Sequence, residues 1–128
     1  MTAWLVRGGR HGEGEAYNIE HGVARIGFVE VSGLAEAKTP DAVVELVRQG
    51  LEQGAARMRV SNVAAQLHAF ANRMQPQDLI VMPMKSRAQI AIGRVSGPYA
   101  FRKEPDELRH VRPVKWVRTD GVRVPSRV

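Results

Sequence analysis

Residues 78–99 read DLIVMPMKSRAQIAIGRVSGPY, and this stretch decides the fold. The apolar run Leu79–Met84 has the length of a strand, and Gln89–Val95 is β-branched at three positions, which favours a second strand. The polar turn between the two runs consists of Lys85, Ser86 and Arg87. The stretch therefore predicts a β-hairpin with two cations at its tip.

Both faces of this hairpin are apolar, with Leu79 and Val81 on one side of the first strand and Ile80, Met82 and Met84 on the other. Strands of this kind are covered on both sides, as in a small barrel with helices packed outside it. Pro83 cannot donate to a strand ladder and indicates an edge position or a bulge. Gly93 indicates a bend or the close approach of another group.

The chain of 128 residues has the size of one domain. It contains no cysteine, no run long enough for a membrane span and no signal peptide, so we expect a soluble, cytoplasmic protein that does not bind membranes. Residues 1–84 carry eight Lys or Arg against nine Asp or Glu, a balance of −1, whereas residues 85–128 carry eleven against four, a balance of +7. This one-sided charge favours a polyphosphate partner, although a basic composition alone is a weak signal.

The rest of the chain adds short strands and amphipathic helices around the hairpin. Strands are predicted at residues 2–7, 23–31, 100–103 and 109–118, and helices at 16–21, 39–54 and 61–74. Thr39 is the expected N-cap of the second helix, with Pro40 at its first position. The predicted class is α+β: a small mixed β-barrel of about five to six strands flanked by two to three helices. We expect one domain over residues 1–120, followed by a tail or the start of a linker over 121–128.

A glycine-rich loop follows the first strand at residues 7–15, RGGRHGEGE. Its composition disfavours regular structure, so its backbone amides and the side chains of Arg7, Arg10 and His11 are expected to be free to meet a ligand. A surface loop without a ligand is the alternative. The glycine spacing fits neither a P-loop nor a dinucleotide fingerprint.

The sequence offers little support for catalysis. The four histidines are scattered and lack the spacing of a metal site, and Glu36-Ala-Lys38 has no acidic strand residue ahead of it as a metal-dependent nuclease would need. No serine has a nucleophile-elbow context. We therefore expect no catalytic residues, no metal and no cofactor in this chain.

The aromatic residues are few, and each has two interpretations. By default Trp4, Phe28 and Trp116 are core residues. Phe70 is also expected in the core, because it belongs to the apolar stripe of a predicted helix. Alternatively, two of them, or one with Tyr17 or Tyr99, form a slot for a flat base, since an extruded base needs aromatic faces and cations for its phosphates.

Five blocks together resemble a known family: AWLVRGGRHGE at residues 3–13, VARIGF at 23–28, DLIVMPMK at 78–85, IGRVSGPY at 92–99 and HVRPVKW at 110–116. Their order resembles the EVE-like, YTH-like branch of the PUA superfamily, specifically the N-terminal domain of Mrr-type, modification-dependent restriction endonucleases. In that family an aromatic residue follows the Ile-Gly of the second strand, and Phe28 matches it.

The resemblance implies a PUA-like barrel that recognises a modified base after the base has been flipped out of DNA. The modification expected in the first instance is methylation. The implied base pocket consists of Trp4, Tyr17, Phe28 and Trp116. The implied DNA-binding residues are Arg7, Arg10, His11, Lys85, Ser86, Arg87, Tyr99 and Arg102. The parent protein would be a restriction endonuclease whose catalytic domain is absent from this chain, and self-association would occur through that parent protein.

Two rival functions use the same residues differently. In the first, an RNA-binding PUA-like module has the same fold and charge. In the second, a regulatory protein-interaction domain keeps all the aromatic residues in its core, and the basic third of the chain is a solvated face.

Overall fold

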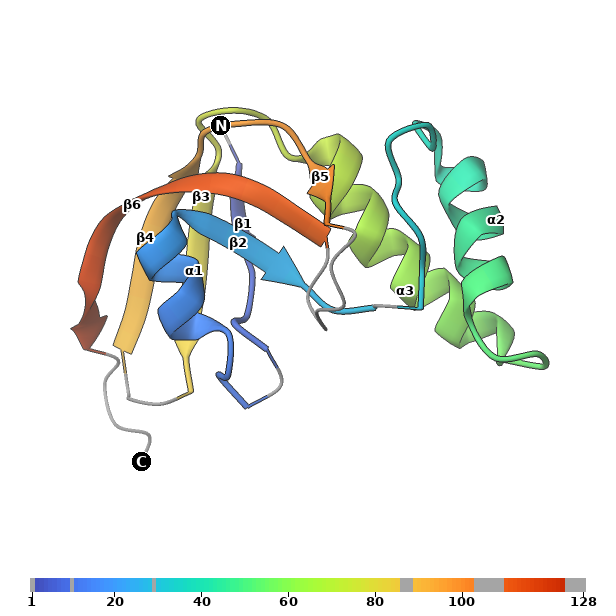
Figure 1. The fold of residues 1–128 in the computed structure, drawn as a ribbon, viewed down its shortest axis with the longest axis horizontal. Helices are drawn as coiled ribbons and strands as arrows, with labels where there is room; N and C mark the ends of the chain where they lie inside the picture. Colours follow the sequence, from blue (N-terminus) through green and yellow to red (C-terminus); the bar gives the residue numbers. More distant parts are fainter. Residues whose placement is uncertain (1, 10, 29, 86–88, 103–109, 124–128) are drawn as a thin grey trace.

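The computed structural model describes residues 2–9, 11–28, 30–85, 89–102 and 110–123 (Figure 1). A short helix lies on one side of the curled strands, and a pair of longer helices lies beside them (Figure 1). In chain order the elements are β1 (Ala3–Leu5), α1 (Glu15–His21), β2 (Val23–Ile26), α2 (Pro40–Gly50), α3 (Arg57–His68), the π-helical turn η1 (Ala69–Arg73), β3 (Leu79–Met84), β4 (Gln89–Val95), β5 (Ala100–Phe101) and β6 (His110–Arg123).

The strands form one curled sheet in the order β1-β3-β4-β6-β2, with β5 also paired to β6. β1 lies parallel to β3, and all the other pairs are antiparallel. The long strand β6 bends, so that residues 110–113 pair with β2 and β5 and residues from 114 to 123 pair with β4 (Figure 1). The predicted class is confirmed: a mixed α+β fold with a six-stranded half-barrel and three helices.

The central hairpin has the predicted alternation of faces. The residues of its inner face are buried, namely Ile80, Met82, Met84, Ala91, Gly93 and Val95. One row across the sheet joins Trp4, Ile80, Gly93 and Trp116, which are paired in register on four neighbouring strands. Because directly paired residues point to the same face, both tryptophans lie on the inner face of the half-barrel.

Gly93 and Pro83 have the roles that the sequence indicates. A Cβ atom on Gly93 would lie 2.6 Å from Val114 Cγ1 and 2.9 Å from Trp116 Cε3, so the glycine makes room for the side chains of β6. The β4–β6 register also shifts next to Gly93. Pro83 lies beyond Val81, the last β3 residue that pairs with β1, so its missing donor leaves the ladder intact there.

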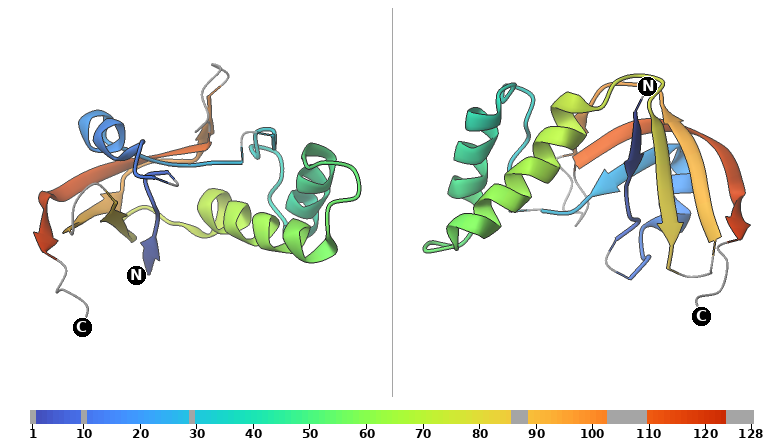
Figure 2. Two further views of the ribbon diagram at one scale, coloured as in Figure 1. Left: turned by 90° about the horizontal axis from the view of Figure 1, so that it is seen from below. Right: turned by 180° about the vertical axis from the view of Figure 1, so that it is seen from behind.

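The expectation that both faces of the hairpin are covered is wrong. The residues of the outer face are only half-buried, namely Leu79, Val81, Pro83, Ile90 and Ile92, and Leu5 of β1 is 62% exposed. Seen from behind, β1, β3 and β4 have no helix in front of them (Figure 2). The longer helices lie beside the sheet, because a core of their own holds them together.

That second core belongs to the helical hairpin, which we define as the connector 30–39 with α2 and α3. Thr39 caps α2 as predicted, its Oγ1 accepting a hydrogen bond from Ala42 N at 3.2 Å. Buried residues from the connector and both helices form the cluster: Val31, Leu34, Ala37, Val43, Val47, Leu51, Val60, Val63, Ala64 and Leu67. Leu46 is partly buried and packs against this cluster.

Several predicted boundaries are shifted. The second strand ends at Ile26 rather than residue 31, since Phe28 has a φ of 65° and turns the chain toward the helical hairpin. α2 ends at Gly50 rather than near residue 54, and α3 begins four residues before the predicted start, at Arg57. β6 continues to Arg123, so the boundary placed at residue 120 falls inside a strand.

Candidate nucleic-acid interface

Two arginines from distant parts of the chain converge on one aromatic ring. The guanidinium carbon of Arg25, on β2, lies 3.9 Å from the centroid of the Tyr17 ring, on α1. Arg102, which follows β5, lies 5.5 Å from the same centroid and donates a hydrogen bond from Nη1 to the Tyr17 hydroxyl. His21 lies one helical turn later, with ring centroids 4.0 Å apart. We call these four residues the Tyr17 cluster.

Local structure explains why these groups meet. Gly22 adopts the left-handed conformation at the end of α1, with a φ of 65°, so the chain turns directly into β2 and brings Arg25 back alongside the helix. Asn18 Oδ1 accepts a hydrogen bond from Arg25 Nε at 2.9 Å, which orients the guanidinium. The backbone oxygen of Asn18 accepts one from Trp116 Nε1 at 2.9 Å, which attaches α1 to the sheet.

The Tyr17 cluster combines the two groups that a nucleobase site needs. The Tyr17 ring is half-buried, while Arg25 is only 5% exposed and therefore held in place. An aromatic face beside guanidinium groups can stack on a base and hold its phosphate. The sequence analysis did not predict Arg25 or Asn18 as site residues. Arg25 could have been noticed as a charged residue on a short alternating strand, whereas nothing in the sequence indicates Asn18.

The glycine-rich loop is not an open amide cradle, contrary to the expectation. Gly14 N donates to Gly8 O at 2.7 Å, Gly12 N donates to Gly9 O at 3.4 Å, and His11 N donates to Glu13 Oε2 at 2.8 Å. The loop folds on itself because glycines at positive φ allow tight turns. What it offers a ligand is side chains, with Arg7 and His11 both exposed.

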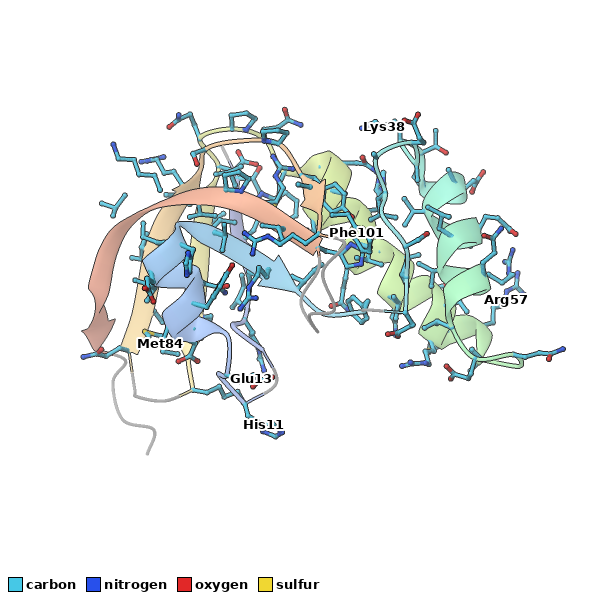
Figure 3. The ribbon with its side chains drawn as sticks, in the orientation of Figure 1. His11, Glu13, Lys38, Arg57, Met84 and Phe101 are labelled. Atoms are coloured by element: carbon cyan, nitrogen blue, oxygen red, sulfur yellow. The ribbon has the colours of Figure 1, made fainter. Side chains whose placement is uncertain are left out.

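Lys85 lies next to this loop, since a Cβ atom on Gly12 would lie 2.9 Å from Lys85 Cβ. Lys85, at the end of β3, is exposed, and its backbone N–H donates to Glu15 Oε2. His11 and Glu13 lie at the same end of the half-barrel as Met84 (Figure 3). The predicted DNA contacts Arg10, Ser86 and Arg87 lie outside the described residues.

The four rings of the predicted base pocket lie in three places. Trp4 and Trp116 are half-buried and pack against the same cluster inside the half-barrel. Tyr17 lies on α1 in contact with Arg25 and Arg102, and Phe28 packs against the core of the helical hairpin. Trp4 also donates from Nε1 to Asp78 Oδ2 at 2.9 Å and has Arg73 at 5.4 Å from its ring.

Tyr99, predicted to support the DNA surface, instead joins the half-barrel to the helical hairpin. Its hydroxyl lies 2.7 Å from Nδ1 of the fully buried His110 and accepts a hydrogen bond from Leu34 N at 3.2 Å. His110 Nε2 lies 3.2 Å from Phe28 O and 3.1 Å from Val31 O. Burial raises the pKa of Tyr99 to about 12, although the Leu34 amide opposes that rise.

Two further charged groups stabilise the half-barrel. The guanidinium of the buried Arg112 donates to the carbonyls of Gly97, Phe70, Ala71 and Met74. Desolvation lowers the Arg112 pKa, and the nearby Asp78 carboxylate opposes this. The Trp4 indole N–H, followed by the Gln75 amide, holds the Asp78 pKa below its ordinary value of 3.8.

The part of the chain that the structure describes has no group of three or more His, Cys, Asp or Glu residues able to hold a metal ion. In that same part no helix has the length and apolar character to cross a bilayer. A cleft of about 670 Å³ lies at the far end of the helical hairpin, lined by polar and small residues that include Arg48, Glu52 and Arg57. No aromatic residue lines this cleft.

These features define a mixed α+β domain built as a half-barrel with an attached helical hairpin. The chain belongs to the family described as a domain of unknown function, DUF8426, whose model matches residues 4–127. No curated protein and no solved structure matches the sequence.

Proposed function

We propose that this chain is a DNA-binding domain that recognises a modified base, methylated in the first instance, by flipping it out of the duplex and stacking it on an aromatic side chain. The observation that carries the proposal is the Tyr17 cluster. A half-buried ring contacted by arginines from β2 and from the segment after β5 would supply both a stacking face and phosphate contacts.

Charge distribution supports the same partner. The C-terminal third of the sequence has a balance of +7, and it contributes Arg102 to the Tyr17 cluster and Lys85 to the neighbouring end of the half-barrel. Flipping a base costs a few kcal/mol and stacking returns roughly 1–3 kcal/mol per base, so phosphate contacts must supply much of the affinity. Binding should therefore weaken steeply with salt.

The pocket residues follow from this arrangement. Tyr17 would be the stacking face, with His21, which is exposed, moving aside to admit the base. Arg102 would hold the phosphate of the flipped nucleotide, and Arg25 would keep the Tyr17 ring in place. Trp4, Phe28 and Trp116 would support the fold around the pocket.

Fluorescence anisotropy with matched duplexes tests the proposal. One duplex carries a single 5-methylcytosine, a second a single N6-methyladenine and a third no modification, each measured from low to high salt. We expect one modified duplex to bind about tenfold more tightly than the unmodified one, a difference near 1.4 kcal/mol. Equal affinity for all three at every salt concentration would contradict base recognition, and tighter binding of single-stranded RNA of the same sequence would favour an RNA-binding module instead.

A further inference from the structure

Glu15 is a buried carboxylate where three segments of the chain meet. It is the first residue of α1, and only 2% of it is exposed. Its Oε2 accepts a hydrogen bond from the backbone N–H of Lys85 at 2.5 Å, across 70 residues of sequence. A charged side chain this deeply buried needs compensating hydrogen bonds, so its position is tightly specified.

The glycine-rich loop fits around the same carboxylate. A Cβ atom on Gly12 would lie 2.5 Å from Glu15 Oε2 and 2.9 Å from Lys85 Cβ, and one on Gly8 would lie 2.6 Å from Glu15 Cγ. Both glycines therefore leave the space that the Glu15 side chain needs to reach Lys85. The loop, the helix and the end of β3 touch one another around this single group.

The charges around Glu15 point outward while Glu15 itself does not. Arg7, His11 and Lys85 are all exposed, and His11 extends away from the half-barrel at this end (Figure 3). The carboxylate is too buried to meet a ligand, so its effect on a ligand must pass through the residues that it holds.

We propose that Glu15 is a positioning residue that fixes Lys85 beside the glycine-rich loop, so that Lys85 and the basic side chains of the loop together contact the phosphate backbone of a duplex. This inference rests on the part of the proposed function that assigns DNA as the partner. It does not depend on whether the bound base is modified. The bond comes from the Lys85 backbone, so the Lys85 side chain can be changed without removing it.

A double-mutant cycle on the full chain with the unmodified duplex tests the inference. Lys85→Gln removes one proposed phosphate contact, and we expect it to weaken binding about threefold. We call the slope of the logarithm of the binding constant against the logarithm of the salt concentration the salt slope, and we expect Lys85→Gln to reduce its magnitude by about 0.9. Glu15→Ala should produce a similar loss, because Lys85 is no longer held. If Glu15 acts through Lys85, the double variant loses no more affinity than Glu15→Ala alone. If the fold-loss of the double variant equals the product of the two single fold-losses, the inference is overturned.

Two further variants separate positioning from simple destabilisation. Glu15→Gln keeps an oxygen that accepts from Lys85 N, so it should retain most of the affinity. Gly12→Ala, at a φ of 79°, keeps the carboxylate but forces the loop away from Lys85, so it should reproduce the smaller salt slope even if Glu15→Ala does not fold. An unchanged slope in Gly12→Ala would overturn the inference.

The two proposals fail in different measurements. Equal affinity for the modified and unmodified duplexes would refute base recognition, but it would not change the result of the double-mutant cycle. Additive losses of affinity in the cycle would refute the role of Glu15, but they would not change the preference for the modified duplex. Arg57→Gln, at the start of α3 and far across the molecule from His11, is the matched control and should change neither (Figure 3).

Discussion

In the helical hairpin two arginines pair with carboxylates at the surface, whereas in the half-barrel three arginines contact an aromatic ring or backbone carbonyls. Arg48 bonds Glu45 at 2.8 Å with both side chains more than half exposed, and Arg59 lies 3.4 Å from Glu52. By contrast, Arg112 and Arg25 are nearly inaccessible to solvent. Exposed pairs add little stability, while a desolvated guanidinium must be satisfied completely. We therefore expect substitutions of charged residues to affect stability more in the half-barrel, and the half-barrel also holds the residues proposed to bind DNA.

The largest expected effect comes from Arg112. Replacing it with alanine leaves the carbonyls of Phe70, Ala71 and Met74 without their donor, and we expect a loss of about 3 kcal/mol in the free energy of unfolding. Arg48→Ala in the helical hairpin should lose about 0.5 kcal/mol or less. Urea denaturation measures both, and equal losses would remove the distinction between the two regions.

Arg102 carries the next largest expected effect, on binding rather than on stability. Arg102→Gln removes the donor to the Tyr17 hydroxyl and a phosphate contact, so we expect about tenfold weaker binding of the modified duplex. Arg57→Gln removes the same charge from the helical hairpin and should change affinity less than about twofold. Anisotropy titrations compare the two, and similar losses would show that total charge, rather than its position, determines binding.

Tyr99→Phe tests the joint between the two regions. The variant loses the hydrogen bonds to His110 and Leu34, and we expect it to be about 1 kcal/mol less stable at pH 8. In the wild type the folded state favours the neutral phenol, so this stability is present below pH 10 and is lost as the pH rises through about 12. The difference between the two proteins in urea should therefore shrink from pH 8 to pH 11; a constant difference would contradict the assigned role.

Asp78 is expected to give the smallest effect, confined to acid. Its folded-state pKa is lowered, so its contribution is present above the ordinary value of 3.8 and is lost as the pH falls through the folded-state pKa. Asp78→Asn should lower the melting temperature by about 3 °C at pH 7. The difference in melting temperature between the wild type and Asp78→Asn should disappear as the pH falls below 3.8. A difference that stays the same in acid would show that the carboxylate charge is not the stabilising feature.

The sequence predicted the hairpin well because its signals are local. Alternation and turn residues identify β3 and β4 without reference to any other segment, and Thr39-Pro40 identifies the start of α2. The alternation of residues 23–31 was misleading, because Val31 is buried in the core of the helical hairpin and does not belong to a strand. Periodicity alone does not say which core a residue enters.

The candidate site was harder to predict because it depends on contacts across the chain. Tyr17 and Arg102 are 85 positions apart, and nothing near either residue indicates that they meet. The glycine-rich loop was expected to present its amides, yet several bond within the loop. Nothing in the sequence indicates that Lys85 lies next to that loop, or that the buried Glu15 joins the two.

The strand β6 has a consequence for how the protein is made. It is C-terminal to every other described element, yet it pairs with β2 on one edge and with β4 and β5 on the other. While the chain leaves the ribosome, β2 and β4 therefore have no strand between them until residues 110–123 emerge. The helical hairpin, whose contacts are closer in sequence, can assemble earlier, so the nascent chain should expose an unfinished sheet edge that a chaperone could hold.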